Sequence, residues 1–261
     1  MSDGRRYMVD VGMYKFPFPI KVLTRDYPQG QPTIADISVH ARILKEFEAN
    51  WIDRFVQVIH KHKDNISPTA IKQNIVDYQE AFGATSVRIN LEYPLFMAKM
   101  TPVSKQKCLV KYDCVSSTKL GSSGFAAKNT FKIDIPVITS DPASDPGRPR
   151  GLFAQISNIA IEIETAEDIH PEYLVDLVDA TALSPVYSFL SREDHEAIIE
   201  KVHNEEKSSV VVADEIKHYL SRNHDILWYS IKMNNYGMLH SYSTLVATEQ
   251  ASMAGTGEYK V

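Results

Sequence analysis

The chain repeats one order of expected strands and helices, and this duplication limits its fold more than any other feature. A strand is expected from Ile20 to Thr24, and the next, from Thr33 to Ile43, alternates strictly between apolar and polar residues. One side of that second strand carries Ile37, Val39, Ala41 and Ile43. Such alternation predicts a strand with one buried face.

Two helices are expected after these strands. Apolar residues recur at helical spacing from Phe47 to Ile59, and a second helix opens at Ser67-Pro68, a favourable N-cap and first-turn pair. Gly83 suits the end of that helix. Two further alternating strands follow, from Val87 to Tyr93 and from Cys108 to Cys114. The first half therefore has the order strand, strand, helix, helix, strand, strand.

The second half repeats this order without repeating the sequence. Its expected strands and helices cover residues 131–137 and 159–163, a helix from Pro171, a helix over 208–220, and strands over 226–233 and 240–247. The order predicts an α+β fold of two tandem ββααββ modules with antiparallel sheets. We expect an N-terminal arm over 1–14, modules over 15–125 and 126–248, and a disordered tail over 249–261.

The charge of the chain narrows the range of partners. A net charge of -5 and a pI near 6.0, with scattered lysines and arginines, give no basic surface for nucleic acid or an anionic membrane. We therefore expect a small-molecule substrate. Cys108 and Cys114 lie too far apart along one strand for a disulfide, and no signal peptide or long apolar span is present, which indicates a cytoplasmic protein. The expected helices cover one face of each sheet, so the other face and the sheet edges would be covered by further copies of the chain. This indicates a homodimer or homotetramer.

Several short motifs occur in the order and at the separations found in one enzyme family. These are Val11-Gly12 before Pro19-Ile20, Arg54-Phe55, Pro102-Val103-Ser104, Tyr112-Asp113 and Ile135-Pro136-Val137. In these motifs the chain resembles the type IB GTP cyclohydrolases. The resemblance implies the tunnelling fold, with active sites at subunit interfaces. It also implies a divalent metal that activates water to attack C8 of the guanine in GTP, from which dihydroneopterin triphosphate is built.

The chain departs from the family at the positions that hold the metal. Asp141 stands where the resemblance implies a cysteine ligand, Phe153 where it implies a histidine ligand, and His195 where it implies a glutamate ligand. The family's purine-anchoring glutamate corresponds to Val210, while its late catalytic histidine is kept as His240. Three further expected pocket residues are Trp51 and Tyr242, each in place of a family histidine, and Gln155.

These departures predict a lost zinc site and a substrate other than GTP. Metal-activated hydrolysis depends on lowering the pKa of bound water to about 7 from about 15.7. A hydrogen-bond donor of the purine that faced an apolar Val210 would have no partner, and this would weaken binding by about 1 to 3 kcal/mol. We therefore expect no cofactor, and an enzyme that acts on a planar or nitrogen-containing small molecule at an interface pocket. His240 would be the general acid/base, with His195 and Asp141 as further catalytic candidates.

Two alternatives remain open at this point. In one, a metal-dependent GTP cyclohydrolase has a rebuilt site, where Asp141, His195 and His240 hold a non-zinc divalent metal such as iron. In the other, the chain is a non-catalytic, ligand-binding paralogue. Simpler explanations also exist for single residues, since an Asp-Pro pair such as Asp141-Pro142 commonly forms a turn and His195 lies in a charged, solvated run.

Overall fold

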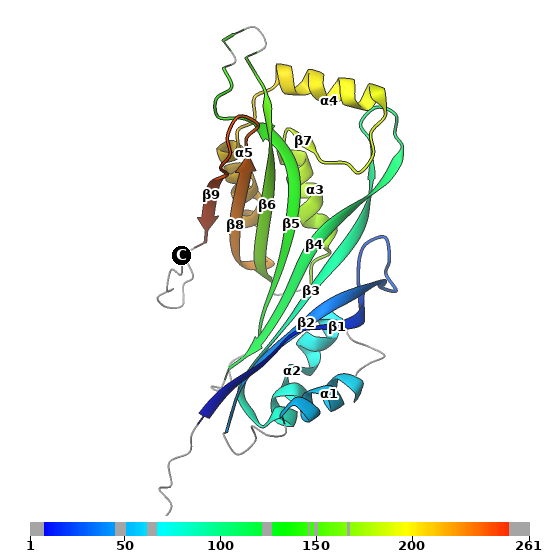
Figure 1. Ribbon diagram of the computed structural model, residues 1–261, viewed down its shortest axis with the longest axis vertical. Coiled ribbons are helices and arrows are strands. Elements are labelled where there is room, and N and C mark those ends of the chain that lie inside the picture. The colour runs from blue at the N-terminus through cyan, green and yellow to red at the C-terminus, as the bar shows by residue number, and fades with distance from the viewer. Residues whose placement is uncertain are drawn as a thin grey trace, which may run out of the picture. The chain divides into compact units, whose positions relative to one another are not determined.

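The chain folds into strands and helices in the duplicated order, as a computed structural model shows for residues 8–44, 51–61, 67–121, 127–145, 147–148, 151–165 and 168–250. It forms two compact units. The first comprises residues 1–95 and 113–131, and the second comprises residues 96–112 and 132–261. The elements of each unit can be followed in Figure 1.

The first unit contains two antiparallel strand pairs separated by two helices. Its elements are β1 (Met8–Val22), β2 (Gln31–Leu44), α1 (Trp51–Lys61), α2 (Pro68–Phe82), β3 (Ala84–Met100) and β4 (Lys107–Leu120). Residues 96–100 of β3 and 107–112 of β4 belong to the second unit. β1 pairs with β2, and β2 with β3. Residues 8–14, expected to form an arm, are the beginning of β1, and residues 8–13 pair with β2. The order ββααββ is the one that the sequence predicted.

The core of the first unit lies between its sheet and its helix pair. The predicted face of β2 is buried, and α1 and α2 cover it with aromatic residues, among them Phe55 and Phe82 with ring centroids 5.9 Å apart. Local signals set the ends of α2. The Ser67 hydroxyl accepts a hydrogen bond from the Ala70 backbone N–H at 3.0 Å, and Gly83 ends the helix with a left-handed φ of 61°.

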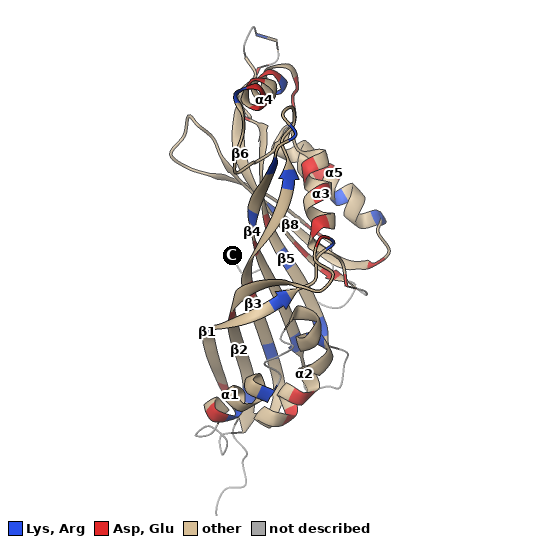
Figure 2. Ribbon diagram, turned by 90° about the vertical axis from the view of Figure 1, so that its right-hand side faces the viewer, with Lys and Arg blue, Asp and Glu red and all other residues tan. Residues whose placement is uncertain are grey.

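The second unit begins and ends with antiparallel strands. Its elements are β5 (Lys128–Ser140), β6 (Ala154–Thr165), α3 (Pro171–Thr181), β7 (Ser184–Pro185), α4 (Arg192–Asn204), α5 (Ser209–Arg222), β8 (Ile226–Tyr236) and β9 (Thr244–Glu249). The strand order is β5-β6-β8-β9, and β7 pairs with β5. Helix α5 packs on β8 and β9, and α3 packs against α5 (Figure 2).

Two expectations for the second unit were wrong. The sequence predicted two helices, but α4 forms a third, because Ser191 and Asp194 cap its first turn reciprocally in a capping box. The sequence also predicted that His240 begins the last strand, but β9 begins at Thr244 and His240 lies in the preceding loop. The expected tail falls almost entirely outside the described residues, and so does most of the connection from Gly121 to Asn129.

Both cysteines are buried and free, in keeping with their spacing along β4. None of the helices in the described part of the chain is long and apolar enough to cross a membrane.

Candidate active site

Four residues of the second unit meet where β8 ends. A Cβ atom placed on Gly237 would lie 3.0 Å from Oδ2 of Asp141, 4.0 Å from Oε1 of Gln155 and 4.0 Å from Cδ2 of His240. We call these four residues the Gly237 cluster. Three of them, Asp141, Gln155 and His240, were candidates from the sequence, and the fold brings them together. Gly237 itself was missed, although a glycine directly after an alternating strand is a recognisable turn signal.

Asp141 is both a turn former and a member of the cluster. Its Oδ1 accepts a hydrogen bond from the Ala143 backbone N–H at 2.9 Å, and its own N–H donates to the Phe153 carbonyl at 3.0 Å. The Asp-Pro turn expected from the sequence is therefore present. Because these contacts fix the carboxylate, Oδ2 is held towards Gly237, and the side chain is buried.

The loop between Asp141 and β6 is closed by its own hydrogen bonds. The Ser144 hydroxyl donates to the Phe153 carbonyl at 2.8 Å and accepts from the Phe153 N–H at 3.1 Å. Gly151 allows the loop to close, since a Cβ atom there would overlap the Asp145 carbonyl oxygen. Phe153 is half-buried and contributes backbone groups to this arrangement, so its backbone and not its ring is what fixes Asp141.

A chain of buried hydrogen bonds supports Gln155. Its amide Nε2–H₂ donates to the Thr139 hydroxyl and the Ser140 carbonyl, both at 3.3 Å. Ser157 donates to Oδ1 of Asn235 at 2.7 Å, so its hydroxyl accepts from Thr139, also at 2.7 Å. The Asn235 amide then donates to the hydroxyls of Ser209 and Thr244 at 3.3 Å. The chain joins β5, β6 and β8 to the first residues of α5 and β9, and it leaves Oε1 of Gln155 facing Gly237.

His240 is the exposed member of the cluster. It lies in the loop between β8 and β9, where its ring stacks on Tyr242 with centroids 4.8 Å apart and an interplanar angle of 19°. Both side chains are exposed, whereas Asp141 and Gln155 beneath them are buried. The arrangement presents an imidazole to solvent on a loop whose first residue, Gly237, lies beside two buried polar side chains.

His195 lies in a different environment from the cluster. Its Nδ1–H donates to the Ser191 carbonyl at 2.8 Å in the first turn of α4. Its side chain lines a hollow of about 230 Å³ whose other walls are apolar, formed by Ile138, Ile156, Pro185, Val186, Tyr187, Leu190, Ile198 and Ile199. An apolar hollow is not a metal site.

The rebuilt metal site expected from the sequence is not formed by this chain's described residues. Across the described ranges, no group of three or more histidines, cysteines, aspartates and glutamates is close enough to hold a metal ion. Asp141, His195 and His240 therefore do not make the expected three-ligand set. Within one chain, the described residues do not supply the ligand set that the resemblance implied, and we assign no step to a metal.

Asp194, the neighbour of His195, is the most strongly anchored carboxylate in the second unit. Its Oδ1 accepts from the backbone N–H groups of Val103 and Ser104 at 2.9 Å, and its Oδ2 accepts from the Ser104 and Ser191 hydroxyls at 2.6 and 2.7 Å. Burial by itself raises the pKa of Asp194, but the hydrogen bonds from Ser104, Ser191 and Val103 outweigh it and hold the pKa well below its usual range. The Pro102-Val103-Ser104 motif thus binds the start of α4.

A largely buried ion pair was also missed from the sequence. Lys99 donates to Oδ1 of Asp179 at 2.7 Å, and its ammonium lies 5.5 Å from the centre of the Tyr112 ring. Burial raises the pKa of Asp179, and the Lys99 charge opposes that rise. Burial also raises the pKa of Tyr112, whose hydroxyl has no hydrogen-bond partner among the described residues.

Two expected substrate contacts are not in the Gly237 cluster. Val210 lies on α5 and is 61% exposed in the single chain. Trp51 is the first residue of α1 in the first unit and is half-buried.

Comparison with known proteins decides the family. A family model described as "Type I GTP cyclohydrolase folE2" matches residues 3–246. The chain belongs to this FolE2 family. Among relatives named GTP cyclohydrolase FolE2, the protein from Thermosipho melanesiensis is 29% identical over 245 residues, which are 93% of each chain. The protein from Geobacter metallireducens is 27% identical over 250 residues, 95% of this chain and 94% of the relative.

Solved structures support the fold. A hyper-thermostable uricase mutant is similar with a TM-score of 0.53 at 9% identity, covering 96% of this chain and 94% of the uricase. Uricase from Arthrobacter globiformis is similar with a TM-score of 0.51 at 8% identity, covering 97% and 96%. These likenesses concern the fold alone and agree with the tunnelling fold. The α+β, antiparallel architecture predicted from the sequence is therefore confirmed.

Membership in the FolE2 family confirms one expectation and overturns another. The resemblance to GTP cyclohydrolases is confirmed at the level of the enzyme family, although the matched family is named FolE2 and the finer type IB label is not carried over. The expectation that the substrate is not GTP was wrong, because the relatives are named for GTP.

Proposed function

We propose that this chain is a GTP cyclohydrolase. The observation that carries the proposal is the FolE2 family match over residues 3–246, together with relatives of that name that align over nearly their whole length. The Gly237 cluster is the part of the described chain that supplies suitable chemical groups. Opening a guanine ring requires proton transfers, and an exposed histidine is suited to them near neutral pH.

We assign the role of general acid/base to His240. Its ring is exposed at the end of the second unit's sheet, and stacking on Tyr242 limits its orientations. Asp141 and Gln155 are buried and directed at Gly237, which lies three residues before His240. They are positioning residues in this proposal, because they hold the loop while His240 contacts GTP. General acid/base groups of this kind contribute about 100-fold to 10,000-fold in rate.

The test is conversion of GTP to a fluorescent pterin by the purified full chain. We expect turnover by the parent protein and a loss of about 100-fold or more in kcat for His240→Ala. The matched control is His224→Ala, which removes an exposed histidine just ahead of β8 and should keep parental activity. A parent protein that forms no pterin from GTP would overturn the proposed function. Equal activity of both variants would instead show that His240 has no part in the reaction.

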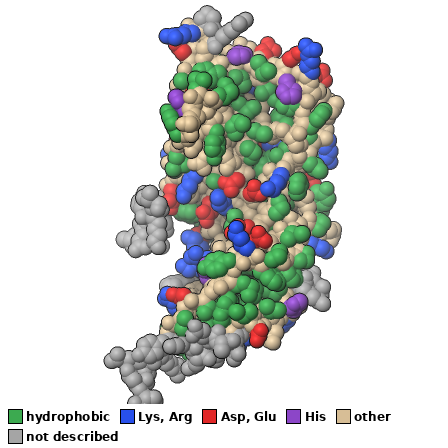
Figure 3. Space-filling view, viewed as in Figure 1, with side chains coloured by type: hydrophobic (Ala, Val, Ile, Leu, Met, Phe, Trp, Pro, Cys, Tyr) green, Lys and Arg blue, Asp and Glu red, His purple; other side chains and the backbone are tan. Residues whose placement is uncertain are grey.

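We further propose that the chain works as a homodimer or homotetramer. Large hydrophobic side chains reach the surface of both units, as the face in Figure 3 shows, and they include Ile34, Leu109, Leu227 and Leu245, each more than half exposed. Such exposure is typical of surfaces that are covered in an assembly. Light scattering coupled to size-exclusion chromatography measures the mass, and a value of one chain would contradict the proposal.

A further inference from the structure

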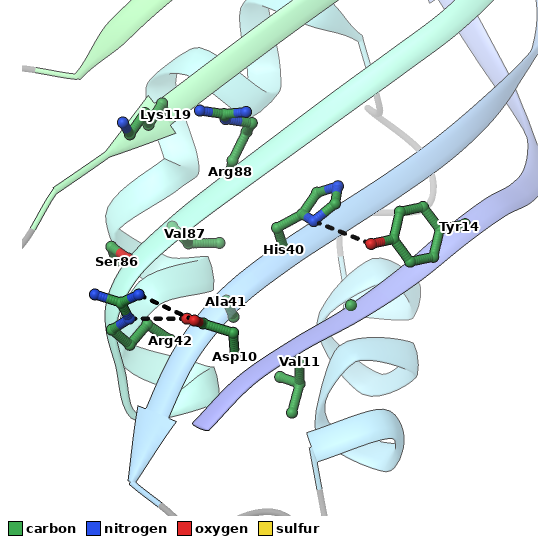
Figure 4. Close-up of a pocket in the computed structure, with 11 residues that line it drawn as sticks. Asp10, Val11, Tyr14, His40, Ala41, Arg42, Ser86, Val87, Arg88 and Lys119 are labelled. Carbon is green, nitrogen blue, oxygen red and sulfur yellow. Dashed lines mark hydrogen bonds and ion pairs between the residues drawn. The ribbon is translucent and has the colours of Figure 1, made fainter. Parts of the chain in front are cut away.

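The open face of the first unit's sheet carries a concavity rich in positive charge. It encloses about 260 Å³ and is lined by residues from β1 to β4, namely Asp10, Val11, Gly12, Tyr14, His40, Ala41, Arg42, Ser86, Val87, Arg88 and Lys119 (Figure 4). We call this set the basic pocket. The chain as a whole has a net charge of -5, so a local surplus of cations needs a specific explanation.

Strand pairing places these side chains on one face. His40 lies opposite Gly12 on β1 and opposite Arg88 on β3, while Arg42 lies opposite Asp10 and Ser86. Residues two apart on a strand share a face, so His40 and Arg42 project together. Their neighbours Val39 and Ala41 project to the other face and are buried in the core. The pocket is therefore a fixed feature of the sheet.

The charges of the basic pocket are unequal. Arg42 donates two hydrogen bonds to the Asp10 carboxylate, at 2.8 and 2.9 Å, and this pairing lowers the pKa of Asp10. Asp10 therefore neutralises Arg42. In the parts of the chain that the structure describes, no acidic partner is found for Arg88 or Lys119. Two cations remain uncompensated in one pocket, an arrangement that an anion would relieve.

Neutral donors and open space complete the pocket. The Tyr14 hydroxyl lies 3.5 Å from Nδ1 of His40, and Ser86 adds a second hydroxyl. Gly12 keeps the floor open, because a Cβ atom there would come within 3.2 Å of the Val39 carbonyl and 3.3 Å of the Tyr14 ring. The volume is smaller than the roughly 300 to 1,000 Å³ of sites that hold whole drug-sized molecules, which favours a compact anion.

The same face becomes acidic further along the strands. Asp36 on β2 lies directly opposite Glu92 on β3, so that two carboxylates are neighbours there. These carboxylates repel an anion and favour its binding at the basic end. The opposite charges along this sheet face therefore determine where on the face an anion binds, which is at the basic pocket and away from the two carboxylates.

We propose that the basic pocket binds a phosphate chain. Arg88 would hold phosphate oxygens through its planar guanidinium, Lys119 would add a second positive charge, and Tyr14 and Ser86 would donate hydrogen bonds. The phosphate chain belongs either to a free inorganic polyphosphate or to a nucleotide whose base lies outside the pocket. This assignment depends on the first unit alone and holds whether or not the chain hydrolyses GTP.

The test is calorimetric titration of the full chain with inorganic triphosphate and, separately, with GTP at low ionic strength. We expect the double variant Arg88→Gln/Lys119→Gln to weaken triphosphate binding at least about tenfold. The matched control is Lys21→Gln/Lys107→Gln, which removes two exposed lysines of β1 and β4 outside the pocket and should bind as the parent does. Raising the salt concentration should weaken binding to the parent protein.

The two ligands separate the two sources of phosphate. Tighter binding of GTP than of triphosphate, lost in the double variant, identifies a nucleotide as the ligand, and equal binding identifies a free polyphosphate. The proposal is overturned if the parent binds neither ligand or if the double variant binds both unchanged. It is also overturned if the double substitution changes the mass measured by light scattering and leaves phosphate binding intact, because the pocket would then be a contact between copies.

Discussion

The two units share an order of strands but differ in where they place polar groups. Among the described residues, the buried polar side chains of the first unit are Thr24, Ser38 and Thr118, and several of its charged groups line the pocket on the open sheet face. The second unit buries many more, including Asp141, Gln155 and Asp194. Buried polar groups must be satisfied by partners, and those partners fix their positions. The second unit is therefore suited to hold catalytic groups, and the first to bind charge at a surface.

The largest effect that tests this comparison is expected from a methyl group at Gly237. In Gly237→Ala the added Cβ atom would lie 3.0 Å from Oδ2 of Asp141, so the loop or the carboxylate must move. Displacing a reacting group by about 1 Å can cost about 100-fold in rate. The shift required here is a few tenths of an ångström, so we expect kcat for GTP to fall by a smaller factor, on the order of tenfold.

Gly121→Ala in the first unit is the control for that substitution. No atom lies within 4 Å of the position that its Cβ would occupy, so we expect parental kcat and an unchanged melting temperature. Parental activity of Gly237→Ala would show that the cluster does not position His240, and would remove the proposed difference between the units.

A smaller effect, on stability, is expected at Asp194. Because hydrogen bonds hold its pKa below the usual value, its stabilising contribution is present above the unfolded-state pKa of about 3.9 and is lost as the pH falls towards the folded-state pKa. Asp194→Asn should lower the melting temperature by several degrees at pH 7. The difference from the parent should shrink below about pH 4.

Asp10→Asn is the matched substitution in the first unit. The pKa of Asp10 is also lowered, by the hydrogen bonds from Arg42, but both side chains are more than half exposed. Exposed ion pairs contribute little to stability. We therefore expect the melting temperatures of the parent protein and Asp10→Asn to agree within about one degree at every pH between about 3 and 7. Equal decreases in melting temperature for Asp194→Asn and Asp10→Asn would contradict the claim that Asp194 is anchored more strongly than Asp10.

A further effect on stability should come from the hydrogen-bond chain under the Gly237 cluster. Ser157→Ala removes partners from both Thr139 and Asn235 and should lower the free energy of unfolding by about 1 to 3 kcal/mol. Ser38→Ala in the first unit removes a single bond, from the Lys15 N–H, and should cost about 1 kcal/mol or less. Urea unfolding measures both. A larger decrease in the free energy of unfolding for Ser38→Ala than for Ser157→Ala would contradict the claim that buried polar groups are more strongly fixed in the second unit.

Much of the fold followed from local sequence patterns. The alternation around Ile37 predicted a half-buried strand, and Ser67 and Gly83 predicted both ends of α2, because these signals act between residues close in the chain. The third helix of the second unit was missed, since Ser191 and Asp194 form its capping box within residues 191–196, which are polar throughout. Short, charged helices carry a weak periodic signal.

The sequence by itself determined the order of elements, the resemblance to GTP cyclohydrolases and the candidates Asp141, Gln155 and His240. Only the tertiary structure decided which candidates meet, joining these three at Gly237 and placing His195 in an apolar hollow. It also decided that Val210 is exposed. The physical reason is that periodicity assigns a side chain to a face, whereas proximity between distant segments depends on strand pairing and loop closure.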